Sequence, residues 1–217
     1  MSSAMFDLIL QATLDTLYMV AVSGLISTLV GLPLGVMLYV TRPRQILAKP
    51  VLNQVLSIIT NVGRSIPFII LMVAIIPFTR MLVGTSIGIN AASVPLTIAA
   101  IPFVARLVEA ALNEISPGLI EAAQAMGATP WQIIGKVLIP EARGGIMTGL
   151  TITVVTLVSY SAMAGAVGGG GLGDLGIRYG YNRFNPTIML ITVVILVVMV
   201  QGFQSLGDYL VRKSDRK

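Results

Sequence analysis

The sequence predicts an all-α integral membrane protein with five transmembrane helices in each chain. Apolar residues make up 55% of its 217 residues and charged residues only 11%, against about 25% charged in a typical soluble domain. Five long apolar segments recur along the chain, and ~20 such residues suffice for a membrane-spanning helix. Cysteine and histidine are both absent, which argues against thiol catalysis, zinc and haem sites and histidine acid–base chemistry. We therefore expect no catalytic residues and no metal site.

The first two spans follow from the distribution of charge. Residues 16–41 form a run of 26 residues without a charged side chain, long enough to cross ~30 Å of hydrocarbon as a tilted helix. Two Asp residues and no Lys or Arg precede this run, the reverse of a signal peptide, so residues 1–12 are expected to form an external segment. The second span is predicted as one helix over residues 54–79, with Arg64 some turns inside the cytoplasmic boundary.

Three further spans are predicted over residues 84–105, 144–167 and 186–207. The fourth span ends at Gly168–Gly171, a run too rich in glycine for regular helix. We expect this run to be a flexible external turn. Residues 208–217 follow the fifth span and are expected to form a basic cytoplasmic tail.

Basic residues gather on one side of these five spans. The segments after spans one, three and five hold ten of the 14 Lys and Arg residues. These ten are Arg42, Arg44, Lys49, Arg106, Lys136, Arg143, Arg212, Lys213, Arg216 and Lys217. The opposite side holds Arg80, Arg178 and Arg183. By the positive-inside rule the N-terminus is predicted outside and the C-terminus in the cytoplasm.

The longest segment between predicted spans, residues 106–143, carries the signals of two short amphipathic helices. Ser116 and Pro117 are typical of a helix start, and Gly127 of the end of that helix. Residues 129–132 begin a second helix with a capping box. The predicted apolar face of the second helix consists of Trp131, Ile134, Val137 and Leu138, before Pro140. From this pattern alone, a partner protein and the membrane interface are equally good covers for the two apolar faces.

One spacing in this segment resembles a known family. The segments that carry it are Glu121-Ala122-Ala123, Gly127 after three more residues, and Val137-Leu138-Ile139-Pro140 after a further nine. They resemble the cytoplasmic EAA loop of type I ABC importer permeases, with Val137 and Ile139 in place of the usual Ile and Leu. The resemblance implies an ABC transmembrane type-1 domain over residues 13–207. It also implies a coupling surface for an ATPase subunit that includes Glu121, Ala122, Ala123, Gly127 and Pro140.

Energy for transport is expected to come from another polypeptide. The chain contains no G-x-x-x-x-G-K-[ST] P-loop, so we expect a transport subunit rather than an enzyme, with no cofactor of its own and with ATP and Mg²⁺ bound by the partner. The resemblance implies a homodimer in the bacterial cytoplasmic (inner) membrane, in contact with lipid. It further implies two ATP-binding subunits and an external substrate-binding protein. No nucleic acid partner is expected.

A narrower resemblance extends over nearly the whole chain. The segments that carry it are Arg64–Phe68, Ile76–Arg80, Val83–Ser86, Tyr160–Met163 and Gly169–Gly173. They are similar to the permease subfamily of the methionine importers, the MetI type, whose chains also have five spans. The resemblance implies transport of L-methionine by alternating access and leaves open whether D-methionine is carried as well. The alternative is a related importer for another amino acid or a small organic solute.

Four residues are candidates for the transport pathway or its gate. Met163, Tyr160 and Ser161 lie on the fourth span, whose small and hydroxylated residues suit a narrow route. Arg64 is the most membrane-embedded charge. Simpler explanations exist for three of them: Met163 as packing filler, Tyr160 in the outer aromatic belt, and Arg64 as a side chain that snorkels to the interface.

A different functional class is disfavoured. Gly171–Asp174 matches the G-x-G-D pattern of intramembrane aspartyl proteases. That chemistry needs two carboxylates that share a proton, and the other acids on this side, Asp7 and Asp15, precede the first span. An intramembrane protease and an ion channel are therefore the less favoured interpretations.

Overall fold

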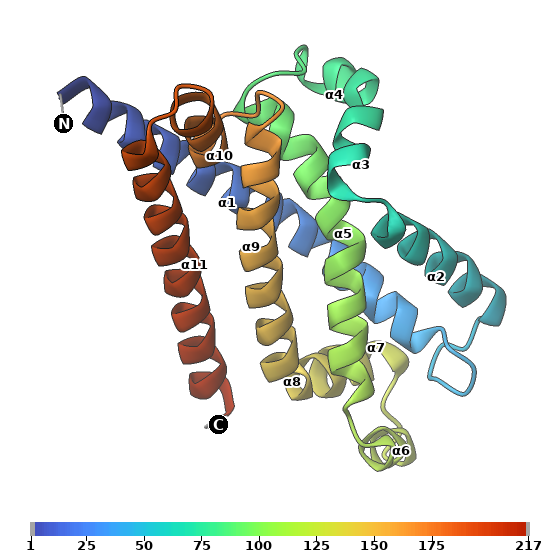
Figure 1. Cartoon of the computed structure of the whole chain (residues 1–217). Helices are drawn as coiled ribbons and strands as arrows, with labels where there is room; N and C mark the ends of the chain where they lie inside the picture. The colour runs from blue at the N-terminus through green and yellow to red at the C-terminus, as the bar shows by residue number, and fades with distance from the viewer. Residues whose placement is uncertain (1–2, 216–217) are drawn as a thin grey trace.

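Helix α1 (Ser3–Val40) runs obliquely across the back of the bundle, behind α9 (Arg143–Gly165) and α5 (Ile89–Asn113), as Figure 1 shows. The computed structural model describes residues 3–215, and within them the chain contains helices and no strand. The 38 residues of α1 extend about 57 Å at 1.5 Å per residue. Because the helix begins at Ser3, the described part of the expected external segment, residues 3–12, belongs to the first helix.

The described residues contain four candidate membrane spans, or five if one bent helix pair is counted as a span. Four helices are each long and apolar enough to span a membrane: α1, α5, α9 and α11 (Pro186–Asp215). The bent pair consists of α2 (Pro50–Ser65) and α3 (Phe68–Ala74), whose axes differ by 100° and which pass the length and hydropathy test only together. The predicted all-α membrane fold class is therefore confirmed, and the α2–α3 pair is the candidate for the fifth span.

The prediction of a continuous helix over residues 54–79 is wrong. Ile66 is extended, with φ of −82° and ψ of 122°. Pro67 is the cause, because proline disfavours helical backbone in the residue before it and has no N–H to donate. A further short helix, α4 (Ile76–Val83), follows α3 and ends at Gly84, which is left-handed with φ of 82°. The second apolar region thus turns sharply instead of running straight.

The third and fifth spans also differ from their predicted bounds. Helix α5 begins at Ile89 and continues to Asn113, so residues 106–113 are helical rather than part of a cytoplasmic loop. Helix α11 runs to Asp215, so the described part of the predicted basic tail continues the fifth helix. Arg216 and Lys217 lie outside the described residues.

Helices α1 and α5 approach each other so closely that glycine is required at the contact. A Cβ atom on Gly31 would lie 2.7 Å from the Cβ of Val104, and one on Gly35 would lie 2.5 Å from the carbonyl oxygen of Ala105. Gly31 and Gly35 form the G-x-x-x-G spacing that lets membrane helices pack backbone to backbone. The oblique course of α1 across α5 depends on this pair.

The connection after α9 is packed rather than flexible, so the expectation of a flexible turn at Gly168–Gly171 is wrong. Helix α10 (Gly171–Leu175) follows it and lies against α1 and α9, and the π-helical turn η2 (Gly176–Tyr181) comes next and lies against α11. Leu172 is fully buried, and its N–H donates to Thr16 Oγ1 at 2.8 Å. A Cβ on Gly171 would lie 2.6 Å from that same oxygen, so the glycine permits the contact.

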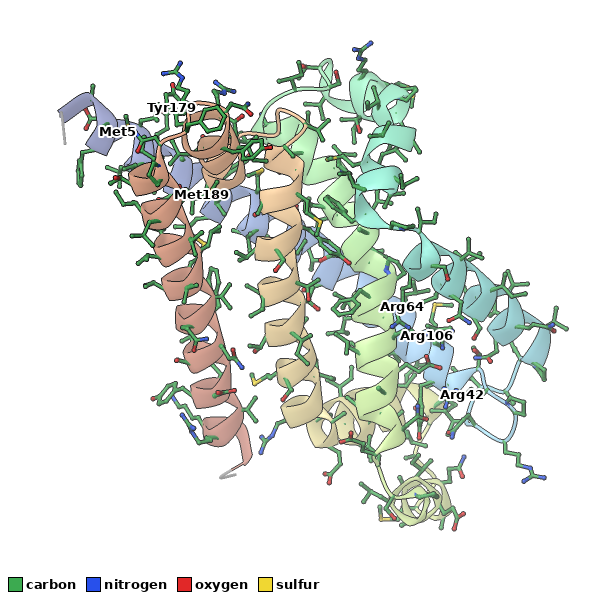
Figure 2. The ribbon with its side chains drawn as sticks, viewed as in Figure 1. Met5, Arg42, Arg64, Arg106, Tyr179 and Met189 are labelled. Atoms are coloured by element: carbon green, nitrogen blue, oxygen red, sulfur yellow. The ribbon has the colours of Figure 1, made fainter. Side chains whose placement is uncertain are left out.

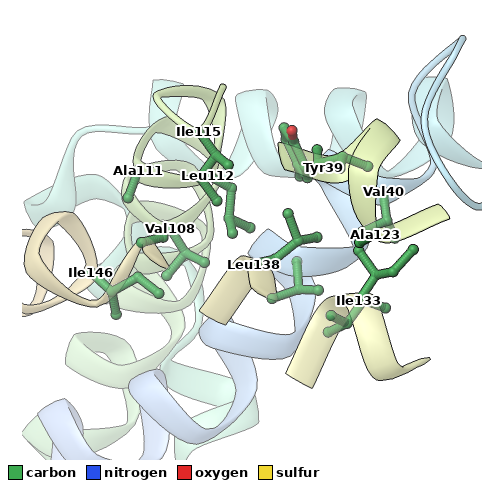
Figure 3. Packing of buried hydrophobic residues seen from close by; sticks show 14 of the residues in the cluster. Tyr39, Val40, Val108, Ala111, Leu112, Ile115, Ala123, Ile133, Leu138 and Ile146 are labelled. Atoms are coloured by element: carbon green, nitrogen blue, oxygen red, sulfur yellow. The ribbon is translucent and has the colours of Figure 1, made fainter. Parts of the chain in front are cut away.

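A buried apolar cluster ties the segment between α5 and α9 to the rest of the bundle. This segment contains α6 (Pro117–Ala125), α7 (Pro130–Ile133), the π-helical turn η1 (Ile134–Leu138) and α8 (Ile139–Glu141). Members of the cluster shown in Figure 3 include Tyr39 and Val40 of α1, Val108 and Leu112 of α5, and Ala123, Ile133 and Leu138 of the segment. The segment therefore rests on α1 and α5 as one packed unit.

Candidate coupling surface and transport pathway

Helices α6 and α7 lie at the end of the bundle opposite α4 and α10 (Figure 1). Helix α6 starts at Pro117 after Ser116, as predicted, and Gly127 follows its end with φ of 79°. The predicted capping box is also present. The Gln132 N–H donates to Thr129 Oγ1 at 3.4 Å, and the Thr129 N–H donates to Gln132 Oε1 at 2.8 Å. Local sequence signals therefore predicted correctly where both helices begin.

The predicted coupling residues divide between an exposed face and the core. Glu121, Ala122, Gly127 and Pro140 are exposed. Ala123 is only 4% exposed and packs in the cluster of Figure 3. Ala123 therefore supports α6 from beneath the exposed face, and its role in coupling stays a prediction. The role of the four exposed residues in coupling stays a prediction.

The predicted apolar face of the second helix is wrong at one position. Trp131 is 76% exposed, whereas Ile133 is buried together with Ile134 and Leu138. The π-helical turn η1 begins directly after α7, and its wider i→i+5 spacing changes which side chains point inward. Trp131 instead joins Leu119 and Met126 among the exposed apolar side chains of α6 and α7.

A largely apolar groove of about 670 Å³ lies between α9, α11 and the start of α3. Met163 lines it and is 47% exposed in the single chain. Ile69 of α3 and Val197 and Gln201 of α11 line it as well. The groove thus places the predicted gate residue on an open face of the protein.

The two other candidates on α9 occupy different surroundings. Tyr160 is half-buried, and its ring stacks on that of Phe68 with centroids 4.6 Å apart and an interplanar angle of 6°. Ser161 is 1% exposed and its hydroxyl donates to the Val158 carbonyl oxygen at 2.7 Å. Ser161 therefore packs inside the protein and does not line the groove, where Ser159 lies in its place.

Arg64 lies apart from the groove. It is exposed in the last turn of α2, where a cation interacts favourably with the helix dipole. The groove residues come from α3, η2, α9 and α11, so the structure does not bring Arg64 together with Met163, Tyr160 or Ser161. The place of Arg64 on the pathway stays a prediction.

One charged cluster was missed by the sequence reasoning. Glu109 of α5 is 3% exposed, and its carboxylate pairs with Arg42 and with Arg106, each at 2.5 Å. Figure 2 labels both arginines beside α5. The spacing of Arg106 and Glu109, three residues apart on a helix, is a signal that could have indicated half of the cluster. The pairing with Arg42, 67 positions away, has no signal in the sequence.

The acidic residue of the G-x-G-D pattern is engaged in an ion pair. Asp174 lies 2.9 Å from Arg178 on the next turn. Within residues 3–215, no group of three or more His, Cys, Asp or Glu side chains is placed to hold a metal ion. The α6–α7 surface and the α9–α11 groove are the two open features that contain residues predicted for coupling and for the gate.

Comparison with known proteins places this arrangement in a family. The model of the binding-protein-dependent transport system inner membrane component matches residues 31–216. The probable D-methionine transport system permease protein of Vibrio cholerae is 60% identical over 97% of this chain and 94% of its own length. The corresponding protein of Escherichia coli K12 is 56% identical over 76% of each chain.

Solved structures agree with the sequence relatives. An inward facing conformation of the MetNI methionine ABC transporter, in a native crystal form, superposes with a TM-score of 0.97 at 56% identity over 99% of both chains. An amino acid ABC transporter with histidines shares the fold at 22% identity, with a TM-score of 0.80 over 97% of this chain and 95% of the other. The chain therefore belongs to the family of binding-protein-dependent transport system inner membrane components, the multi-pass permease subunits of ABC transporters.

Proposed function

We propose that this chain is the membrane permease of an ATP-driven importer that carries methionine across the bacterial cytoplasmic membrane. The observation that carries the proposal is 60% identity to a permease of D-methionine transport over 97% of the chain. At that level of identity the residues of the groove and of the α6–α7 surface are expected to be similar. The chain itself is then the transport subunit, and ATP with Mg²⁺ is bound and hydrolysed by a partner.

The permease acts as a homodimer around a shared route. In an assembly with twofold symmetry, a pathway along the axis is lined by the same residues of both copies. The α9–α11 groove, with Met163 exposed in it, is the face that would meet its symmetry mate. Two copies of this flexible apolar side chain close the route, and their separation opens it in alternating access.

The exposed α6–α7 surface is the docking site for the ATPase. Leu119, Met126 and Trp131 supply an apolar face on short helices, which suits helix-in-groove recognition. Glu121 and Ala122 lie on the same exposed helix. Two ATP-binding subunits would dock on the two copies, and an external binding protein would deliver the solute at the opposite end, near α4 and α10. The N-terminus would then lie outside and the C-terminus in the cytoplasm.

The character of the groove fits methionine as cargo. Its lining is mostly aliphatic, with polar groups from Ser159 and Gln201. An apolar thioether with a zwitterionic head can pass such a lining without a dedicated charged site, which leaves selectivity mainly to the binding protein. Another amino acid or small organic solute with a similar apolar side chain is the alternative.

Uptake by the reconstituted complex tests the proposal. We expect proteoliposomes that contain the permease, its ATPase and the binding protein to accumulate labelled L-methionine with ATP and not without it. Unlabelled D-methionine or another amino acid, if it is also transported, should reduce the uptake of labelled L-methionine. ATP-dependent uptake of a different solute with no uptake of methionine would favour the alternative.

A further inference from the structure

A buried carboxylate fixes two arginines at the cytoplasmic end of α5. Glu109 Oε1 lies 2.5 Å from Arg42, and Glu109 Oε2 lies 2.5 Å from Arg106. The glutamate is 3% exposed and the Arg106 side chain 19%. Charges in such surroundings are held strongly in one geometry, because a displaced partner would leave an uncompensated buried charge. Arg106 is thus a rigid extension of α5 rather than a mobile surface side chain.

The two arginines differ in what else they hold. Arg106 reaches α2, where it donates to Asn61 Oδ1 at 2.9 Å and to the Ser57 carbonyl oxygen at 3.2 Å. Arg42 donates to Asn113 Oδ1 at 2.6 Å, which returns to α5. The cluster therefore ties α2 to α5 through Arg106.

These tied helices lead to the two candidate functional surfaces. Below the cluster, Leu112 of α5 and Ile115, just after the end of α5, pack in one core with Ile120 and Ala123 of α6. Beyond Asn61, α2 continues through the break at Pro67 into α3. There Phe68 stacks on Tyr160, and Ile69 lines the groove that contains Met163.

We propose that the Arg106–Asn61 contact, held by Glu109, is a positioning device that transmits movement of the α6–α7 surface to α3 at the gate. The inference rests on the proposed function and adds to it the residues through which ATP hydrolysis is coupled to the pathway. Movement of a docked α6 carries α5 with it through their shared core. Arg106 then moves α2 together with α5. Because α2 is joined to α3 by the sharp turn at Ile66 and Pro67, the movement of α2 shifts Phe68 and Ile69.

A purely structural role for Asn61 is the competing explanation, and α2 supplies a matched control. Asn53 also lies on α2 and also anchors it, but to the first helix and its connection. Its Nδ2 donates to the Leu38 carbonyl oxygen at 2.6 Å and to Thr41 Oγ1 at 3.1 Å. Asn61→Ala removes the side-chain hydrogen bond by which Arg106 holds α2 and leaves the one to the Ser57 carbonyl oxygen. Asn53→Ala removes a tie of α2 to α1. Both variants leave the Glu109 ion pairs in place.

The number of methionine molecules transported per ATP hydrolysed separates the two explanations. In proteoliposomes with ATPase and binding protein, we expect Asn61→Ala to lower this ratio by about two- to tenfold, with ATP hydrolysis retained. Asn53→Ala is expected to lower thermal stability comparably and leave the ratio within error of wild type. Equal loss of the ratio in both variants, or no loss in Asn61→Ala, would overturn the inference.

A second readout does not depend on the cargo. The chain has no native cysteine, so a spin label on Val62→Cys, at an exposed position of α2, reports the distance between the two copies. We expect ATP with the ATPase to change this distance in the wild-type background and Asn61→Ala to abolish the change. A wild-type complex that neither imports methionine nor forms a dimer contradicts the proposed function. An intact ATP-dependent change in the Asn61→Ala variant contradicts the positioning role alone.

Discussion

The ring of Phe68 lies parallel to the ring of Tyr160, with centroids 4.6 Å apart and an interplanar angle of 6°. Phe68 is the first residue of α3, directly after the Pro67 break, and Tyr160 lies one turn before Met163 on α9. This stack is therefore the contact that joins the bent second span to the helix that carries the candidate gate.

Loss of the Phe68 ring is expected to destabilise the protein and disturb the gate together. Phe68 is 6% exposed in a buried cluster, and Phe→Ala changes in cores cost about 3–5 kcal/mol. We expect Phe68→Ala to lower the melting temperature and to reduce ATP-dependent uptake. Tyr160→Phe keeps the stacked ring and should retain thermal stability. If Phe68→Ala melted like wild type, the stack would contribute no stability.

Truncation of Met163 distinguishes a gate from packing filler. The side chain is 47% exposed in the single chain, so its removal leaves little cavity within one protomer. As a gate, Met163→Ala should raise the basal leak of solute from proteoliposomes or the basal ATPase rate. If it packs in a dimer interface, the change should cost ~2–5 kcal/mol of dimer stability without a leak. A leak assay and a thermal melt on the same preparation decide between the two.

Gly127 is expected to be required for its backbone conformation, not for its small size. Nothing lies within 4 Å of a Cβ built on Gly127 or on Gly135, but only the former of these two has a positive φ, 79°. Gly127→Ala should therefore cost about 1–2 kcal/mol and displace α7, which weakens ATPase binding in a pull-down. Gly135→Ala is the control and should bind the ATPase normally. Equal binding by both variants would remove Gly127 from the coupling surface.

Neutralisation of Glu109 should strongly destabilise the fold. Glu109→Gln leaves Arg42 and Arg106 close together without their shared carboxylate, and breaking a buried ion pair costs about 3–5 kcal/mol. Asp208→Asn removes an exposed carboxylate from α11 and should change stability by less than about 0.5 kcal/mol. Thermal melts of the two variants in detergent make the comparison. Similar melting temperatures would mean that the cluster is energetically neutral.

Reporter fusions test the predicted topology. A reporter after Lys217 should behave as cytoplasmic, and one inserted within residues 176–182 as external. The physical reason is the excess of Lys and Arg in the segments after spans one, three and five. Activity of both reporters on one side of the membrane would contradict five crossings.

Features that depend on local chemistry could be predicted from the sequence. Apolar length predicted the spans, because a helix that satisfies its own backbone hydrogen bonds is a stable state for such a segment in hydrocarbon. The start of α6 at Pro117 and the capping box of Thr129 and Gln132 were also predicted. In each case the residues that determine the feature lie within a few positions of one another, so the local sequence is enough to predict it.

The tertiary structure decided what depends on residues far apart in the chain. Pro67 could be seen to weaken a helix, but the 100° bend of α2 against α3 depends on packing against α5 and α9. The burial of Ser161 and Ala123 and the exposure of Trp131 depend on which face meets a neighbouring helix. Glu109 gives the clearest case, because its partner Arg42 is 67 positions away. A local sequence pattern gives no information about such a contact, because the two residues meet only when α1 packs across α5.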